Sequence, residues 1–170
     1  HGARACHVAA NVIDDALLCA GQRVGERGTK IGQVILETGH GAGGACLLCH
    51  DGFDVLGHLT YVCKSVHNPS HGPVPLAEHR ELTDEILKLL VKKGKGLEVN
   101  TSGVDRCNAY LPSPDYLRLF KDLGGNIVTV GSDAHDPSRV GQYAPQAMQM
   151  LQDIFGHVCT FEDRKPIFHK

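Results

Sequence analysis

The chain has 170 residues, which is enough for one domain with a buried core. A hydrophobic content of 42% and a charged content of 21% are typical of a soluble globular protein and exclude a disordered one. The net charge of −2 gives no reason to expect nucleic acid or an anionic membrane surface as a partner, and no apolar run is long enough to span a bilayer.

The cysteines and histidines narrow the class of protein further. The seven cysteines are irregularly spaced, so a complete disulfide framework is not expected. No secretory signal is recognisable, and a reducing cytoplasm is the expected location. Eleven histidines are many for this length and favour metal chemistry. The first residue is His1 rather than Met, which favours a fragment or a processed product. Nothing in the pattern indicates an oligomeric state.

Residues 1–50 show no clear order of elements. Residues 11–20 have the apolar spacing of a helix, residues 28–36 can hold a strand, and residues 39–44 form a glycine-rich loop. That loop lacks the Lys-Ser/Thr ending of a phosphate-binding P-loop. We therefore expect a poorly defined N-terminal segment over 1–50 and a well-ordered region over 51–170.

One short motif closes this first segment. Cys46-Leu47-Leu48-Cys49-His50 matches the pattern for covalent c-type haem attachment, with His50 as the axial ligand. Such a protein would need export, and no export signal is visible. Cys46 and Cys49 can instead form half of a zinc site, although no second Cys/His pair stands at the usual spacing. We favour free thiols in a helix or a loop.

From residue 53 onward, strands and helices alternate. The clearest helix covers 78–93, where apolar residues from Leu82 to Leu90 recur on one face. The expected elements are a strand at 53–58, a helix at 78–93, a strand at 96–100, a helix at 113–124, a strand at 127–130, a helix at 138–155 and a strand at 157–161. This alternation predicts an α/β fold with a parallel sheet and helical crossovers.

The most informative stretch is Gly131-Ser132-Asp133-Ala134-His135, which follows a run of β-branched residues typical of a buried strand. If the chain stays extended, Asp133 and His135 point to the same side. A carboxylate and an imidazole on one face make half of a divalent-metal site. The alternative is that Asp133 caps a helix and His135 is an ordinary loop histidine. Asp136-Pro137 predicts an N-cap and a first-turn proline for the next helix.

Polar residues also close the two preceding strands. His58 ends the first of them, and Asn100, followed by Thr-Ser-Gly, ends the second. The carboxyl ends of parallel strands meet at one edge of a sheet, where chemistry gathers in folds of this kind. His58 and Asn100 are therefore expected to converge with Asp133 and His135, and this convergence is the main argument for an enzyme.

Three residues have open roles at this stage. Asn100 either orients a ligand or closes a turn. Lys64 either reaches an anionic substrate or is a surface charge. Glu98 alternates with Leu97 and Val99, so it is left open between facing water and facing away from the neighbours of Asn100.

Four motifs stand in order along the second region. They are Gly-His-Leu at 57–59, Leu-Glu-Val-Asn-Thr-Ser-Gly at 97–103, Gly-Ser-Asp-Ala-His at 131–135 and the ending Arg-Lys-Pro-Ile at 164–167. Together these motifs resemble the PHP-domain histidinol-phosphatase family. The resemblance covers about residues 53–169.

The resemblance implies a fold and a reaction. The fold would be a partial, distorted TIM-like (β/α)7 barrel of the PHP type, with divalent metal ions (Zn, Mn or Fe) at its C-terminal rim. The reaction would be metal-dependent hydrolysis of a small phosphorylated substrate, L-histidinol phosphate, to L-histidinol and phosphate in histidine biosynthesis. Closely spaced metal ions suit this reaction, because phosphate monoesters hydrolyse extremely slowly unaided.

The resemblance also assigns residues. His58, Asp133 and His135 match the family's metal ligands, and Asp133 and His135 are the implied catalytic residues. Lys64 and Asn100 are the implied substrate-binding residues.

The sequence departs from the family pattern before residue 53. The His-x-His motif of the family's first strand occurs nowhere in the chain, and Lys30 stands where a family strand carries a metal-binding Glu. Barrels of this type run to about 250 residues. We therefore expect an incomplete phosphatase chain, with an inactive remnant of the family as the alternative and a haem protein as the third hypothesis.

Overall fold

The computed structural model of the chain describes residues 52–61, 77 and 80–170. The N-terminal segment 1–50, the haem-type motif at 46–50 and Lys64 lie outside the described residues. The division into regions at residue 50 therefore stays a prediction. None of the described helices is long and apolar enough to cross a membrane.

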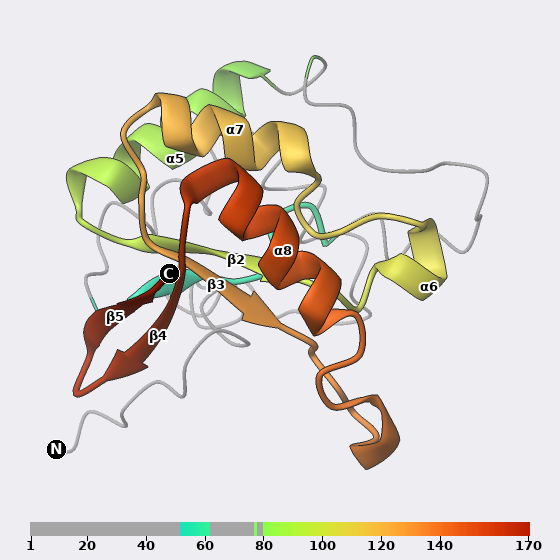
Figure 1. Ribbon diagram of the computed structural model, residues 1–170. Coiled ribbons are helices and arrows are strands. Elements are labelled where there is room, and N and C mark those ends of the chain that lie inside the picture. Colours follow the sequence, from blue (N-terminus) through green and yellow to red (C-terminus); the bar gives the residue numbers. More distant parts are fainter. Residues whose placement is uncertain (1–51, 62–76, 78–79) are drawn as a thin grey trace, which may run out of the picture.

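Three parallel strands form the centre of the described fold (Figure 1). They are β1 (Val55–Leu56), β2 (Gly96–Asn100) and β3 (Val128–Gly131), in the order β1-β2-β3. Leu97 pairs with Val128, and Asn100 pairs with Gly131. The α/β class with a parallel sheet is thereby confirmed, whereas closure into a barrel is not shown by the described strands.

Three helices lie together on one side of this sheet (Figure 1). They are α5 (Arg80–Lys92), α7 (Pro114–Asp122) and α8 (Ala144–Phe155). Each follows the predicted amphipathic pattern, and Pro114 occupies the first turn of α7, where a missing N–H costs nothing. The three helices pack against one another and against the strands through a single apolar cluster.

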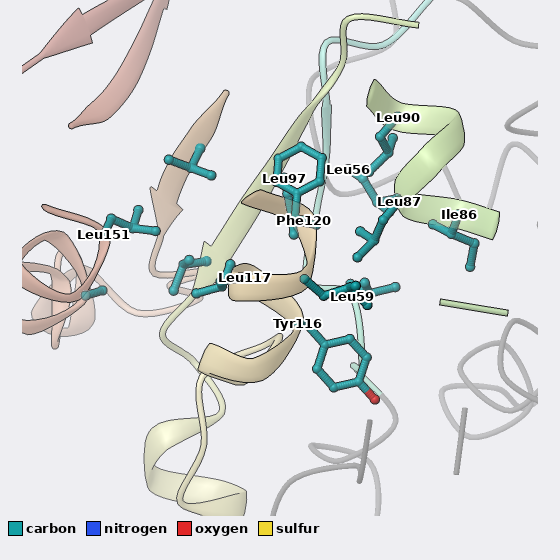
Figure 2. Packing of buried hydrophobic residues seen from close by; sticks show 14 of the residues in the cluster. Leu56, Leu59, Ile86, Leu87, Leu90, Leu97, Tyr116, Leu117, Phe120 and Leu151 are labelled. Carbon is teal, nitrogen blue, oxygen red and sulfur yellow. The ribbon is translucent and has the colours of Figure 1, made fainter. Parts of the chain in front are cut away.

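The alternation of side chains along β2 separates an apolar face from a polar one. Leu97 and Val99 are fully buried and belong to the cluster that includes Phe120 of α7 and Leu90 of α5 (Figure 2). Since successive strand residues point to opposite faces, Glu98 and Asn100 share the face turned away from the helices. The face of β2 that is turned away from the helices therefore carries the polar side chains of Glu98 and Asn100.

The predicted helix at 138–155 is wrong over its first six residues. A 3-10 turn, η3 (Pro137–Arg139), comes first, and α8 begins only at Ala144. Gly141 and Tyr143 both adopt left-handed backbone conformations, with φ of 74° and 60°, and these are incompatible with a continuous helix. A short helix after β2, α6 (Val104–Cys107), was not predicted.

The last predicted strand exists as β4 (Val158–Glu162), but it does not extend the parallel sheet. It pairs in antiparallel fashion with β5 (Lys165–His169), which was not predicted. The two residues between them, Asp163 and Arg164, have φ of 47° and 63°. Positive φ at both central positions is the signature of a tight type I′ hairpin turn, so no helical crossover can follow β4.

Candidate functional site

The polar residues that follow the three strands lie along one edge of the sheet. His58 lies two residues after β1, Asn100 ends β2, and Asp133 lies two residues after β3. Because the three strands are parallel, all three residues lie at the same, carboxyl edge of the sheet. This edge is the candidate site.

Glu98 joins the three strand ends. Its Oε2 accepts hydrogen bonds from the backbone N–H of His58 at 2.9 Å and from the side-chain amide of Asn100 at 3.2 Å. Its Oε1 lies against Gly131 of β3, so close that a Cβ there would stand 2.0 Å away. Both orientations that the sequence had left open are wrong: Glu98 is 9% exposed, so it does not face water, and it bonds to Asn100, so it does not face away from that residue. The two-residue spacing to Asn100 was the signal that places both side chains on one face.

Asn100 is held by the protein at both ends of its side chain. Its amide nitrogen donates to Glu98, while its Oδ1 accepts from the backbone N–H and the hydroxyl of Ser102, at 3.0 and 2.6 Å. The residue is 1% exposed. This geometry suits a residue that orients its neighbours, and direct contact with substrate stays a prediction.

Asp133 and His135 come together, though not as two residues of an extended strand. The strand ends at Gly131, and Asp133 adopts a left-handed conformation with φ of 46°. His135 Nε2 nevertheless lies 3.5 Å from Asp133 Oδ1. The imidazole is 88% exposed and lies in solvent, whereas the carboxylate is 23% exposed and mostly covered.

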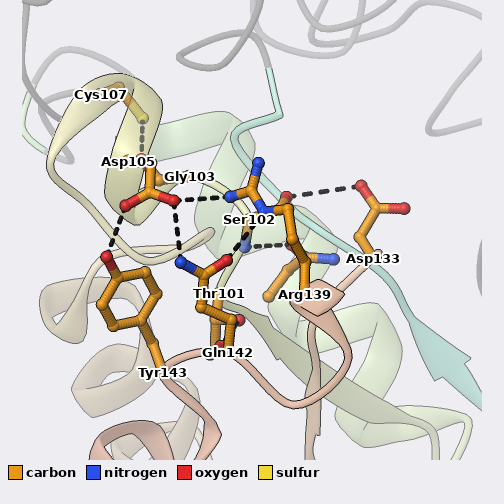
Figure 3. A network of polar contacts seen from close by, with 10 residues as sticks. Thr101, Ser102, Gly103, Asp105, Cys107, Asp133, Arg139, Gln142 and Tyr143 are labelled. Atoms are coloured by element: carbon orange, nitrogen blue, oxygen red, sulfur yellow. Dashed lines mark hydrogen bonds and ion pairs between the residues drawn. The ribbon is translucent and has the colours of Figure 1, made fainter. Parts of the chain in front are cut away.

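Ser102 connects this pair to the rest of the site. Its hydroxyl lies 3.4 Å from Asp133 Oδ2 and also donates to Asn100 (Figure 3). A hydroxyl carries one hydrogen, so Ser102 can donate to Asn100 or to Asp133 but not fully to both. The four residues Glu98, Asn100, Ser102 and Asp133 therefore form a continuous line of polar contacts. Sequence reasoning missed Ser102, although it stands in the Thr-Ser-Gly turn that follows β2.

His58 has an unsatisfied buried nitrogen. Its backbone φ is 32°, its ring packs 4.9 Å from that of Tyr61, and its Nδ1 is buried without a hydrogen-bond partner among the described residues. Buried polar atoms are almost always paired, so a partner from outside the described residues is expected for this nitrogen. His58, Thr60 and Asp133 all carry positive φ at this edge, and backbone strain of this kind clusters at functional sites.

The described side chains do not form a complete metal site by themselves. Within the described ranges, no three His, Cys, Asp or Glu side chains are grouped so that they can hold one ion. The donors that are present are of the right chemical type, namely imidazole nitrogens and carboxylate oxygens. The structure brings Asp133 and His135 into contact and links His58 to them only through Glu98, Asn100 and Ser102.

Two residues of the loop after His135, Asp136 and Tyr143, have shifted pKa values. Hydrogen bonds from the hydroxyl and the backbone N–H of Ser138 lower the pKa of Asp136, which caps η3 as predicted. A hydrogen bond to Asp105 raises the pKa of Tyr143, and desolvation acts in the same direction. The loop is therefore organised by charge and hydrogen bonding.

Comparison with known proteins points to one activity. The chain is 35% identical over 102 residues to a probable histidinol-phosphatase of Thermotoga maritima, a match that covers 59% of this chain and 40% of that protein. It is 30% identical over 125 residues to a probable histidinol-phosphatase of Clostridium acetobutylicum (71% of this chain, 47% of that protein) and 32% identical over 121 residues to the histidinol-phosphatase of Lactococcus lactis (68% and 43%). No family model matches the chain.

A solved structure agrees with these relatives. The crystal structure of histidinol phosphate phosphatase from Lactococcus lactis, in complex with zinc, L-histidinol and phosphate, matches with a TM-score of 0.63 and 27% identity. The match covers 82% of this chain and 51% of that chain. The chain thus resembles histidinol-phosphatases in sequence and in structure. It spans less than half the length of the curated relatives it matches.

Proposed function

We propose that this chain is part of a metal-dependent phosphomonoester hydrolase of the PHP-domain histidinol-phosphatase family. It would hydrolyse L-histidinol phosphate to L-histidinol and phosphate in cytoplasmic histidine biosynthesis. The observation that carries the proposal is the meeting of His58, Glu98 and Asp133 at one sheet edge, in a fold that matches the zinc, L-histidinol and phosphate complex. The parallel β-α order supports a place for the chain in the carboxyl half of a (β/α)7 barrel.

The proposed roles follow from the chemistry of the donors. The Nδ1 of His58 and the Asp133–His135 pair would bind divalent ions, Zn, Mn or Fe, together with ligands from outside the described residues. Such ions supply charge stabilisation at the phosphoryl oxygens and a hydroxide nucleophile near neutral pH. Asn100 would orient groups at the site, and Lys64 would attract the phosphate as a point charge.

Phosphate release from L-histidinol phosphate, with Mn²⁺ or Zn²⁺ added, tests the proposal. We expect release by the unaltered chain and a loss of at least about a hundredfold in Asp133→Ala, because a metal ligand acts on the transition state directly. Asp115→Ala is the control, since Asp115 is a highly exposed residue of α7 whose side chain pairs with Arg118 of the same helix.

The alternative is that the chain is an inactive remnant. The incomplete donor set among the described residues favours it, as does the lack of any His-x-His in the sequence. Elemental analysis of the purified protein separates the two. More than one bound metal ion per chain supports the enzyme, whereas a folded protein with neither metal nor phosphate release leaves only common ancestry.

A further inference from the structure

The loop that carries Asp133 and His135 has no apolar anchor. From Ser132 to Tyr143 every residue is at least partly exposed, and the one large aliphatic side chain of the loop, Val140, is 73% exposed. Hydrophobic burial is the usual force that fixes a segment, and here it is missing. The position of the loop must therefore depend on polar contacts.

Three of these polar contacts converge on one carboxylate. Asp105 Oδ2 accepts hydrogen bonds from Arg139 Nη2 at 2.6 Å and from Gln142 Nε2 at 3.2 Å (Figure 3). Asp105 Oδ1 accepts from the hydroxyl of Tyr143 at 2.5 Å. Arg139 also donates through Nε to Gln142 Oε1 at 2.8 Å, so these two donors support each other. We call this group, Asp105 with Arg139, Gln142 and Tyr143, the clasp.

The clasp joins the loop after β3 to the segment after β2. Asp105 lies in α6, three residues after Ser102, which itself contacts Asp133. Thr101 adds a bond from its hydroxyl to the backbone carbonyl of Gln142 at 2.6 Å. Within the loop, the N–H of Gly141 donates to the hydroxyl of Ser132 at 3.2 Å. The loop is thus closed next to Asp133 at one end and fixed to the β2 segment at the other.

We propose that Asp105 is a positioning residue for the Asp133–His135 pair. It contacts neither member of the pair, but it is the shared acceptor for three side chains of the loop that presents them. Its loss removes three hydrogen bonds at once. The bonds from Gln142 and Tyr143 join a neutral donor to the carboxylate, and the bond from Arg139 joins two charged groups. The inference rests on the proposed function only where it treats Asp133 and His135 as metal ligands.

Amide hydrogen exchange is the first test, and it does not require activity. In Asp105→Ala we expect the amides from Ser132 to Gly141 to exchange about tenfold faster or more, because local opening no longer has to break the clasp. Asp105→Asn keeps one acceptor oxygen without the charge, so its exchange should be intermediate. The matched control is Asp115→Ala, since Asp115 is also a first-turn helix aspartate paired with an arginine on the surface. Unchanged exchange of Gly141 in Asp105→Ala would overturn the proposal.

Metal affinity is the second test, and it separates positioning from a purely structural role. Competition with a chromophoric chelator measures Zn²⁺ binding by the full chain. We expect Asp105→Ala to bind Zn²⁺ about tenfold more weakly with the same number of ions, whereas a lower unfolding midpoint alone would report only the lost hydrogen bonds. Faster exchange with unaltered affinity would mean that the clasp holds the loop without positioning the pair. If the unaltered chain binds no Zn²⁺, the proposed function fails, and nuclear Overhauser contacts between Asp133 and the His135 ring then decide the proposal. Their loss in Asp105→Ala supports it, and their persistence overturns it.

Discussion

The carboxylate of Glu98 contacts three residues at the sheet edge, namely His58, Asn100 and Gly131. A buried carboxylate is costly unless its oxygens are paired, and here Oε2 is paired twice, with His58 and Asn100. The Oε1 atom occupies the space left by the missing side chain of Gly131. A glycine at this point of β3 is therefore needed for close approach, since the backbone of Gly131 is not left-handed.

This close approach predicts the effect of adding one methyl group at Gly131. In Gly131→Ala the new Cβ would lie 2.0 Å from Oε1 and 2.9 Å from Cδ of Glu98. Glu98 cannot withdraw without breaking its bonds to His58 and Asn100, so we expect the free energy of unfolding to fall by about 1–3 kcal/mol. Denaturant unfolding measures it. Gly52→Ala is the control, because nothing lies within 4 Å of the place that its methyl group would take.

A double-mutant cycle identifies the cause of that loss. If the methyl group acts by displacing Glu98, the cost of Gly131→Ala should largely disappear in a Glu98→Ala background, because the clashing atoms are gone. Equal costs in the two backgrounds would show that the methyl group disturbs β3 itself. The same pair of variants also reports whether His58 depends on Glu98 for its backbone position.

The ionisation of the Tyr143 hydroxyl reports on the clasp, because this hydroxyl donates to Asp105. The hydrogen bond to Asp105 raises the pKa of Tyr143, and desolvation and the charge of Asp105 add to it, while Gln142 and Arg139 oppose it. A raised tyrosine pKa means that the protonated form is favoured in the folded state. Its contribution to stability is therefore complete below the unfolded pKa of about 10 and is lost as the pH rises through the folded value.

We accordingly expect Tyr143 to ionise at higher pH than a free tyrosine, and Asp105→Asn to return it toward the ordinary value. Carbon-13 NMR of labelled tyrosine rings follows the titration, and Tyr143→Phe assigns the signal. A Tyr143 titration that is the same with and without the Asp105 carboxylate would contradict the hydrogen bond on which the shift depends.

At the scale of elements, the local sequence pattern correctly predicted the helices and strands that local side-chain burial determines. The apolar stripe from Leu82 to Leu90 gives α5 because one helical face is buried against the sheet, and the β-branched run gives β3. The same reasoning extended α8 too far, because Val140 stands at helical spacing from Ala147 and Leu151. Val140 is exposed, and the chain around it follows the clasp rather than a helix. Arg139 bonds to Asp105, which lies 34 residues away in the sequence. A contact over this separation cannot be recognised from the local sequence pattern.

The hairpin was hidden for a different reason. Asp163-Arg164 is not one of the glycine-containing pairs that mark a type I′ turn, so no turn was expected there. Non-glycine residues carry a backbone cost in this conformation, which must be offset by contacts elsewhere. Arg164 makes such a contact, and it spans most of the described chain.

At the scale of the whole molecule, the parallel direction of the strands was predictable from the alternation of strands and helices, and so was the edge at which the polar strand ends lie. The side-chain network at that edge was predictable only in part. His58, Asn100, Asp133 and His135 were identified by residue type, whereas Glu98 and Ser102 act through partners that become neighbours only after the strands pair. The residue type alone identifies a possible ligand. The residues that orient the ligand are identified only from their contacts in the folded structure.

The C-terminal hairpin is connected to the start of β1 across 110 residues of sequence. Arg164 in the hairpin turn donates to both oxygens of Asp54, through Nε at 2.9 Å and Nη2 at 3.0 Å. Lys95 lies 3.8 Å from the same carboxylate. The bond to Asp54 also raises the pKa of Arg164, so the guanidinium stays protonated. This two-pronged geometry is available to a guanidinium and not to an ammonium group.

The geometry yields a prediction about Arg164→Lys and Arg164→Ala. Both replacements place an ordinary side chain at the same left-handed position, so comparing them isolates the contact from the backbone cost. We expect hairpin amides near the turn to exchange faster in both, with Lys restoring only part of the protection because it cannot bind both oxygens of Asp54. The sheet amides of β2 should not change, since Val158 and Cys159 keep the base of the hairpin buried. Arg118→Ala is the control, because Arg118 pairs with a highly exposed aspartate three residues away. Full protection in Arg164→Lys would show that charge alone holds the hairpin, and the fork of hydrogen bonds would then have no part in joining the end of the chain to the sheet.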